Sequence, residues 1–508
     1  MSSRLSGTLV AAAVLLFGAA HVGNPDTLYE GAAGPYRIRV IVRPPGIVPG
    51  QADITVRVLA GEGVRSVLVL PLRGGRPTAE EPPPDSARPV RGHPHLYNAQ
   101  LWLMEGGAYS IRVDLAGAPG GGTVIVPVNS VATRRLGLAT PLAIGLIGLG
   151  LFLFVGAVTI VGAAVRESVL APGTEPDASR RRRSWWIRII AVPVLALAVF
   201  AGKKWWDGED ARHTASLYRP MQVATRVDTG PAQRVLTLAI TDSDWLGRQY
   251  TPLIPDHGKL MHLFLVRDDL GAFGHLHPLM ADSSTFRTTL PPLPAGHYRL
   301  YADVVHESGF TQTLVDTVTV TAGAPTWRAP DPDDSWWESD RPSAFSRQRT
   351  VQLEDGLTMT WLRDSTPLVA GHDIDLRFQV AARDGRPAEL EPYMGMASHA
   401  VITRDDGAVF VHIHPAGTIS LASQLAFALR QPGDTVRGRL GGRITAAEQS
   451  SSAMPSMVME GEPGIVTLPY AFPQPGRYRL WIQVKVKGRL LTGAFDATVE
   501  PSATNGVK

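Results

Sequence analysis

Residues 262–278 read HLFLVRDDLGAFGHLHP, and residues 399–415 read HAVITRDDGAVFVHIHP. The two windows align without a gap, so each has a histidine, twelve residues, a histidine, one residue, a histidine and a proline. Six of the fourteen histidines in the 508-residue chain lie in these windows. Because imidazole is the commonest metal ligand among side chains and suits copper and zinc, the repeated histidines are the first candidates for a functional site.

Each window has the pattern of a β-hairpin, with apolar residues on either side of a loop of about four residues that contains Asp-Asp. If Arg267 pairs with Ala272, His262 lies directly opposite His277. His275 shares the face of His277, because side chains along a strand alternate with a period of two. The same reasoning groups the second set: His399, His412 and His414. The sequence therefore predicts two imidazole triads, and a register shift of one residue would remove both.

Candidates for additional ligands lie just before each hairpin. His257 precedes the first hairpin by five residues, Met394 occupies the aligned position before the second, and Met396 follows it. Three more methionines lie in a serine-rich segment: Met454, Met457 and Met459. The chain has no cysteine, which excludes thiolate zinc sites, cysteine-bound iron–sulfur clusters and blue-copper centres. A mixture of imidazole and thioether donors favours copper, with zinc as the alternative.

A structural interpretation of the histidines stands beside this one. Phe264, Val266 and Phe273 share the face of the first triad, and histidines hydrogen-bonded to the backbone would give the same pattern. Three imidazoles on one buried face, however, need partners for six ring nitrogens. A shared metal ion supplies such a partner, so metal binding is the first hypothesis and packing is the second.

Composition narrows the function further. The net charge of +3 is small and dispersed, so we expect no nucleic-acid partner. The sequence contains no nucleophile elbow, phosphate-binding loop or paired-carboxylate site in a suitable context, so we do not expect an enzyme.

A second repeated phrase indicates the fold. Gly-x-Tyr opens an alternating segment three times, at Tyr109, Tyr298 and Tyr478, as in the tyrosine corner of Ig-like sandwiches. We therefore predict a mainly β protein with three Ig-like β-sandwich domains, the first of them without the histidine hairpin. The expected bounds are 30–130, 215–322 and 348–500, with a polar, proline-rich linker at 323–347.

Apolar segments predict a membrane anchor. Residues 1–20 resemble a signal peptide or an N-terminal anchor, with cleavage expected after Ala20. Residues 136–165 and 185–202 are predicted transmembrane α-helices, so two spans separate the first sandwich from the second. The loop 166–184 carries five arginines and is expected to be cytoplasmic by the positive-inside rule, which places the sandwiches outside the cytoplasm.

The region around the hairpins, with its phrase PYAFPQPGRYRLW at 469–481, resembles bacterial secreted proteins of the heavy-metal-binding and YtkA-like families. The first domain, leading into a membrane helix, is similar to YtkA-like and FixH-like envelope modules. The resemblance implies cupredoxin-related sandwiches and a role in copper handling or oxidase assembly at the bacterial inner (cell) membrane. The His-x-Met motif of known copper carriers is absent near the end of the chain, so the resemblance assigns no ligands beyond the six hairpin histidines.

Three hypotheses follow. The first is a multi-pass membrane protein that handles copper for tolerance, storage or delivery, with one ion in each histidine-bearing domain and large periplasmic domains. The second is a structural or interaction protein whose histidines only pack. The third is an accessory subunit of a respiratory or efflux complex in the envelope.

Overall fold

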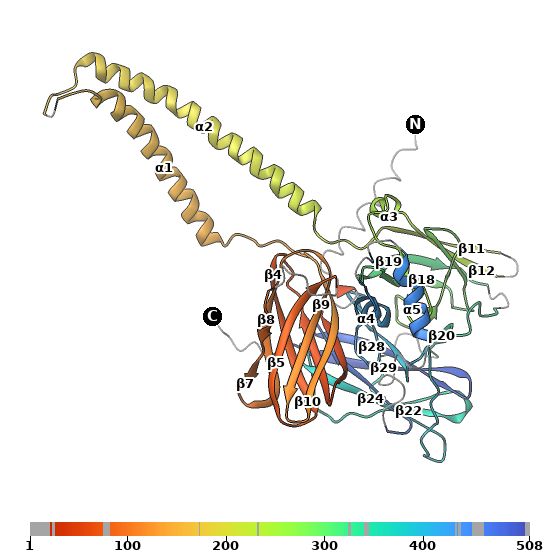
Figure 1. The fold of residues 1–508 in the computed structure, drawn as a ribbon. Helices are drawn as coiled ribbons and strands as arrows, with labels where there is room; N and C mark the ends of the chain where they lie inside the picture. The colour runs from red at the N-terminus through yellow and green to blue at the C-terminus, as the bar shows by residue number, and fades with distance from the viewer. Residues whose placement is uncertain are drawn as a thin grey trace, which may run out of the picture. The chain divides into compact units, whose positions relative to one another are not determined.

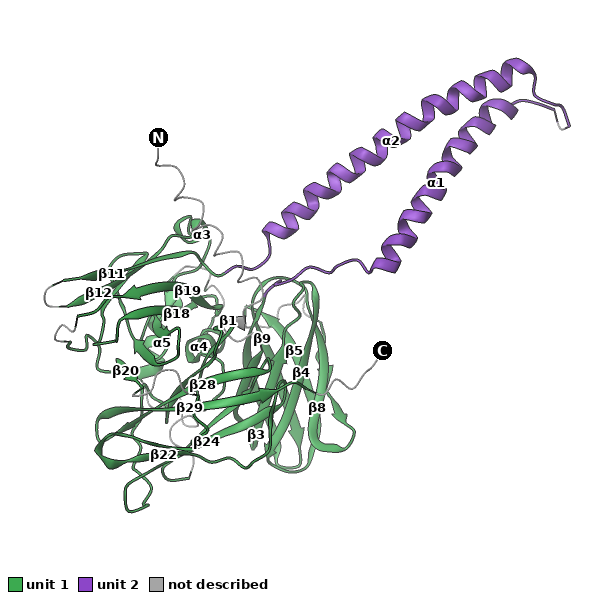
Figure 2. Ribbon diagram, turned by 180° about the vertical axis from the view of Figure 1, so that it is seen from behind, with its two compact units in different colours: residues 1–130, 220–508 green, residues 131–219 purple. Residues whose placement is uncertain are grey.

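The computed structural model describes residues 21–22, 26–74, 82–171, 173–230, 233–323, 327–339, 345–431, 434, 438–449 and 462–502. The chain forms two compact units, shown in Figure 2. Unit 1 comprises residues 1–130 and 220–508 and is built from β-sheets, whereas unit 2 comprises residues 131–219 and contains two long helices. The protein is mainly β, as predicted, with 45% of residues in strands and 21% in helices.

The N-terminal sandwich consists of two antiparallel sheets (Figure 1). Buried and partly exposed residues alternate along its strands, because one face of each sheet packs on a common core. One sheet is formed by β2 (Thr27–Ala33), β3 (Tyr36–Arg43), β4 (Gly50–Ala60), β8 (His93–Leu103) and β7 (Arg88–Val90). The other is formed by β10 (Gly120–Ser130), β9 (Gly107–Gly117), β5 (Val64–Arg73) and β6 (Asp85–Ser86).

The second sandwich, called repeat one, also has two sheets. Its four-stranded sheet contains β11 (Val223–Thr229), β12 (Arg234–Ile240), β17 (Thr285–Thr289) and β16 (Leu279–Met280). Its six-stranded sheet contains β13 (Leu253–Ile254), β18 (Gly296–His306), β14 (His262–Arg267), β15 (Ala272–Leu276), β20 (Ser335–Glu338) and β19 (Thr311–Val320). A short helix, α3 (Ser243–Leu246), follows β12.

The third sandwich, called repeat two, follows the same plan. Its four-stranded sheet contains β21 (Thr350–Gln352), β22 (Thr358–Trp361), β24 (Asp373–Ala381) and β27 (Ile465–Ala471). Its six-stranded sheet contains β1 (His21–Val22), β26 (Val409–Ile413), β25 (His399–Arg404), β28 (Gly476–Val486), β29 (Arg489–Glu500) and β23 (Leu368–Val369). A 3₁₀ turn at Glu354–Gly356 links β21 to β22.

Two helices lie between β26 and β27 in the chain: α4 (Leu421–Ala428) and α5 (Arg439–Gln449). The sequence suggests one short helix within residues 416–429, which α4 bears out, but α5 is missed. The α5 sequence contains two adjacent glycines and is mostly polar, so its helical signal is weak. It gains stability from packing, because Leu440 and Ile444 are buried in a small apolar cluster with α4.

The region expected to be a linker contributes a strand. Residues 335–338, within the predicted polar, proline-rich linker 323–347, form β20, which pairs antiparallel with β15 at the edge of repeat one. Trp336 packs against the core of repeat one and Trp337 against the cluster between the repeats. The tryptophans and the strand pairing together hold this segment to the sandwich.

Unit 2 contains α1 (Thr140–Glu167) and α2 (Ala178–Ala215). Both are long and apolar enough to cross a membrane. Helix α2 extends beyond the predicted span 185–202 at both ends, so Arg180 to Arg183 lie in its first turns and not in a loop. The Asp177 side chain caps this end by accepting from the Arg180 N–H, and arginine favours helix, which explains the early start. Pro193 lies inside α2. Residues 1–20, the expected signal segment, lie outside the described residues.

The predicted tyrosine corners are confirmed in both repeats. The Tyr298 hydroxyl donates to the Pro294 carbonyl and the Tyr478 hydroxyl to the Gln474 carbonyl, each at 2.7 Å and four residues upstream. In the N-terminal sandwich the Tyr109 hydroxyl instead accepts from the Glu105 N–H at 3.3 Å. The three tyrosines therefore fix the turn before the strand that each begins.

Replacing Tyr478 with Phe should destabilise unit 1 by about 1 kcal/mol, because it removes one buried hydrogen bond and little volume. The measurement is the urea midpoint of the detergent-solubilised protein, followed by tryptophan fluorescence. Tyr109→Phe is the matched comparison and should cost less, since its hydrogen bond is longer. Equal midpoints for Tyr478→Phe and the unmodified chain would contradict this role.

Candidate metal centre

The first hairpin has the predicted register. Phe264 pairs with His275 and Leu263 with Leu276 across β14 and β15, which places His262 opposite His277. His262, His275 and His277 are all buried. Alternation along the strands brings the three imidazoles to one face, as the sequence indicates.

The second hairpin repeats this register. Val401 pairs with His412 and Ala400 with Ile413 across β25 and β26, so His399 lies opposite His414. His399 and His414 are also buried, and the His412 side chain is only 5% exposed. Both hairpins therefore present histidines on the face that they bury.

The two hairpin faces pack against each other, which the sequence does not predict. An apolar cluster with residues from both repeats fills the contact: Phe264, Val266, Leu270, Phe273, Tyr301, Val401, Phe410 and Trp481. Its contacts are reciprocal. Tyr301 of repeat one stacks on Phe410 of repeat two with ring centroids 3.9 Å apart, and Trp481 of repeat two stacks on Phe273 of repeat one at 4.8 Å. The repeats thus face each other with approximate two-fold symmetry.

This packing gathers the histidines of both hairpins into one buried group. We call it the histidine cluster: His257, His262, His275, His277, His399, His412 and His414. Rings from different repeats are as close as rings within one repeat. The His262 and His412 centroids, for example, are 5.4 Å apart, and those of His257 and His414 are 5.1 Å apart. The expectation of one separate site in each domain is therefore replaced by a single cluster between the domains.

The first triad is the predicted one, His262, His275 and His277, with one nitrogen from each ring within 4.8 Å of the others. A hydrogen bond holds the other side of each ring. His262 Nε2–H donates to the Asp256 carbonyl at 3.0 Å, and His275 Nδ1–H donates to Gln483 Oε1 at 2.8 Å. His277 Nδ1–H donates to the Asp334 carboxylate at 3.0 Å. Such partners orient metal-binding histidines and set their tautomers.

These hydrogen bonds leave one nitrogen of His262 and one nitrogen of His275 with lone pairs that face each other and accept no hydrogen bond. A neutral imidazole has one N–H, and in His262 and His275 that N–H is already donated. His262 Nδ1 and His275 Nε2 nevertheless lie 3.2 Å apart, so neither can donate to the other. Neighbouring nitrogens of a tetrahedral site with metal–nitrogen bonds of about 2.0–2.1 Å are about 3.3–3.4 Å apart. The spacing therefore fits two ligands of one metal ion.

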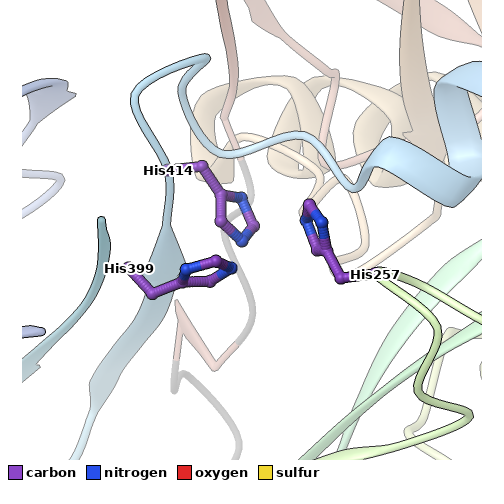
Figure 3. A group of neighbouring side chains, drawn as sticks. All are labelled: His257, His399 and His414. Atoms are coloured by element: carbon purple, nitrogen blue, oxygen red, sulfur yellow. The ribbon is translucent and has the colours of Figure 1, made fainter. Parts of the chain in front are cut away.

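The second triad differs from the prediction. It consists of His257, His399 and His414, whose nitrogens lie within 4.8 Å of one another, and Figure 3 shows the three rings turned toward a common point. His257 comes from repeat one and the other two from repeat two. His257 lies in a tight turn with φ of +52°, and Glu448 of α5 accepts hydrogen bonds from the N–H groups of His257 and Gly258. Repeat two thus holds the turn that presents His257.

His412, which we expected in the second triad, is turned elsewhere. Its Nδ1 faces the Asp303 carboxylate of repeat one at 3.5 Å. Asp303 pairs with His262 across the sheet of repeat one, and Gln483 occupies the corresponding position opposite His399 in repeat two. Gln483 accepts a hydrogen bond from His275. The middle histidine of each hairpin, His275 or His412, is therefore oriented by a residue of the other repeat. His412 lies between the two triads, with its ring within 5.6 Å of His262, His275, His399 and His414.

Many ring nitrogens of the cluster lack a hydrogen-bond partner among the described residues. Seven such buried atoms occur: both nitrogens of His399 and of His414, and Nε2 of His257, His277 and His412. An unsatisfied buried polar atom costs about 1–3 kcal/mol, so seven cost on the order of 10 kcal/mol. That is comparable to the net stability of a whole domain, about 5–15 kcal/mol. A cation bound to these nitrogens would remove much of the cost.

Burial governs the ionisation of the cluster. It lowers the pKa of His262, and it holds the pKa of His275, His277, His399, His412 and His414 well below the usual value, so these rings are neutral. Neutral imidazole is the form that binds metals. Burial also raises the pKa of nearby carboxyls, to about 6 for Asp303 and about 7 for Asp334 and Glu448.

A further group combines His277 with Asp331 and Asp334. The Lys259 ammonium pairs with Asp331 at 2.6 Å and with Asp333 at 3.1 Å, so a cation of the chain itself already contacts both carboxylates. We assign Asp334 the role of orienting His277, and Asp331 that of a partner for Lys259.

The predicted methionines have different surroundings. Met394 occupies the same tight turn in repeat two as His257 in repeat one, with φ of +48°, and is half-buried. Met396 is buried. Met454, Met457 and Met459 lie outside the described residues.

Five further histidines lie outside the cluster. His93 and His95 are exposed at the start of β8, and His297 hydrogen-bonds Thr319 at an exposed site. His306 is buried but binds the Thr251 carbonyl and stacks on Tyr250. His372 is exposed beside β24.

Sequence reasoning missed three residues that orient the rings, namely Asp303, Asp334 and Gln483, and it missed Tyr393, whose hydroxyl lies 3.3 Å from His275 Nδ1. Asp256 was visible beside His257, and Asp334 lay in the acidic segment interpreted as a linker. Asp303 and Gln483 had one available signal, because both follow the repeated Gly-x-Tyr phrase and alternate onto the histidine face.

Comparisons with known proteins give a family but no activity. The model of the family described as "Domain of unknown function (DUF8832)" matches residues 221–322 and 349–501, half of the chain and nearly all of the two repeats. Among curated proteins, none matches the chain.

Solved structures give only distant likenesses. An engineered protein is 20% identical over 20% of this chain and 21% of its own, with a TM-score of 0.15. A tetra-tandem repeat from the extending region of a large adhesion protein is 8% identical over 89% of this chain and 71% of its own, with a TM-score of 0.15. Alpha-2-macroglobulin from E. coli is 8% identical over 93% of this chain and 23% of its own, with a TM-score of 0.20.

The metal-free protein should lose stability on acidification. The five histidines with strongly lowered pKa stay neutral in the folded state, whereas unfolded histidines take up protons below about pH 6.5. The raised pKa values of Asp303, Asp334 and Glu448 act in the opposite direction, since the folded state binds those protons first. Between about pH 6 and 5 the unfolded state therefore binds about two more protons than the folded state. The free energy of unfolding should fall by roughly 3 kcal/mol for each pH unit of acidification over this range. Urea titrations of chelator-treated protein test this, and constant or rising stability over that range would contradict a neutral cluster.

Proposed function

The chain belongs to the DUF8832 family, whose description assigns no function, and we propose from the histidine cluster that it is a membrane-anchored copper-binding protein of the cell envelope. The observation that carries the proposal is the set of bare lone pairs at the first triad. Each of its three rings is held by a hydrogen bond on one side and directs its other nitrogen to a common point. A cluster of packing histidines would have no reason to arrange its acceptors this way.

Copper is favoured over zinc by the chemistry of the donors. Imidazole binds copper in both oxidation states and also zinc, whereas thioether selects Cu(I). Met394 occupies in repeat two the turn position from which His257 reaches the second triad. From the approximate two-fold symmetry we infer that its thioether is a soft donor on the side of the first triad. Zinc remains the alternative ion, and tolerance, storage or delivery are the roles that such a site serves.

The two apolar helices support an anchored protein. We place them as two spans of the bacterial inner membrane with the arginine-rich connection in the cytoplasm, so the sandwiches lie on the outer side. Arg166 lies in the last turn of α1, and Arg180 to Arg183 lie in the first turns of α2, which concentrates positive charge at one end of both helices. Copper handling in that compartment is consistent with the absence of thiols. The rival roles, a scaffold or an accessory subunit of another envelope complex, have no specific observation in their favour.

Metal binding is tested by the stoichiometry of the detergent-solubilised full chain after dialysis with copper. We expect about two ions, one for each triad. His275→Ala combined with His277→Ala should remove one, because the first triad then keeps only His262. His297→Ala is the control and should keep both, since His297 is exposed outside the cluster. Thermal unfolding of each variant verifies folding. A folded protein that takes up neither copper, zinc nor nickel at micromolar concentration would overturn the proposal.

Topology is tested by cysteine labelling, because the chain has no native cysteine to give background. A cysteine replacing Thr174, between the helices, should react with a membrane-impermeant maleimide only after spheroplasts are permeabilised. A cysteine replacing the exposed His93 should react in intact spheroplasts. The reverse pattern would contradict the proposed orientation.

A further inference from the structure

We propose that the two triads hold their ions as one dinuclear centre shared by both repeats, with His412 between the ions. This inference rests on the proposed function, because it concerns the arrangement of the bound ions. The triads are neighbours in one cluster. The rings of His257 and His262 are 6.3 Å apart, and those of His275 and His399 are 6.4 Å apart. With metal–nitrogen bonds of about 2.0–2.1 Å, ions in the two triads lie on the order of 6–8 Å from each other.

The ligands of the second triad come from both repeats. Repeat one supplies His257, and repeat two supplies His399 and His414. Glu448 of repeat two fixes the His257 turn through two backbone hydrogen bonds of 2.9 and 3.0 Å. This ion site therefore exists only when the two repeats are packed together.

The first triad depends on the other repeat in the same way. Its ligands all belong to repeat one, but Gln483 of repeat two sets the tautomer of His275, and the Gln483 amide in turn donates to Ser335. Tyr393 of repeat two also places its hydroxyl against His275. In an isolated repeat the second triad would lack ligands, and the first triad would lack the groups that orient His275.

His412 occupies the space between the triads. Its Nδ1 faces Asp303, and its Nε2 is buried without a partner among the described residues. Its ring centroid is 5.4 Å from that of His262 in one triad and 4.4 Å from that of His414 in the other. We assign it as the seventh imidazole, available to either ion.

The surrounding charges allow two cations in so small a volume. Four carboxylates lie beside the cluster histidines or hold the turn of His257: Asp256, Asp303, Asp334 and Glu448. In their ionised forms they carry four negative charges, which equal the charge of two divalent ions and exceed that of two monovalent ions by two. Since like charges at this separation repel strongly in a buried site, such compensation is required for simultaneous binding.

The test is electron paramagnetic resonance of the full-length protein loaded with Cu(II). A dinuclear centre should give a dipole-broadened spectrum with a half-field transition once two ions are bound. His257→Ala should remove the ion whose other ligands lie in repeat two, and the remaining ion should give a sharp, uncoupled spectrum. His257 is only partly buried in a surface turn, so the variant should fold, and its unfolding temperature checks this. His297→Ala should keep the coupled spectrum.

The outcomes separate the two proposals. If no metal binds, the proposed function fails. If two ions bind but their spectra are those of isolated Cu(II), or if His257→Ala keeps both ions and their coupling, metal binding stands and the dinuclear centre is overturned.

Discussion

The packing of one histidine hairpin face against the other is the contact on which the rest of the site depends. It buries Phe264, Phe273, Phe410 and Trp481 in one apolar cluster and removes the neighbouring imidazoles from water. In that environment an imidazole nitrogen without a partner is costly. A protein that builds a large apolar contact around so many bare nitrogens must either bear that cost or relieve it with a ligand. The geometry of the first triad, with its lone pairs 3.2 Å apart, is compatible with the cation that we propose.

Duplication explains the approximate symmetry of this contact, and divergence explains why its two halves differ. Asp303 and Gln483 occupy corresponding positions opposite the first histidine of each hairpin, yet one is a carboxylate and the other an amide. Asp334 supports His277, whereas neither nitrogen of His414 has a partner among the described residues. The two triads would therefore surround a bound ion with different electrostatic environments. Two ions bound here would differ in affinity, because oriented carboxylates raise the basicity of the histidines they contact.

The hairpins could be predicted from sequence because the residues that determine their pairing lie close together in the chain. A strand period of two and a short acidic loop are enough to pair His262 with His277 and His399 with His414. The membership of the second triad could not be predicted, because it depends on which sheet faces meet, and no periodicity within one hairpin encodes that. The same limit applies to His257, which looks like an extra ligand for its own hairpin but reaches the other repeat. The strand at 335–338 was hidden by the acidic, proline-rich segment before it.

The N-terminal sandwich supports the second hairpin directly. Its β2 strand accepts and donates hydrogen bonds with the loop after His414: the Glu30 N–H donates to the Ala416 carbonyl at 2.9 Å, and the Thr418 N–H donates to the Leu28 carbonyl at 2.8 Å. Arg39, itself buried, pairs with Glu30 of its own sandwich and with Asp373 of repeat two. A buried ion pair of this kind adds little net stability but penalises any arrangement that breaks it. The loop that carries His414 is thus held on one side by the N-terminal sandwich and on the other by repeat one. A ligand set fixed from both sides would lose little conformational entropy on binding the proposed ion.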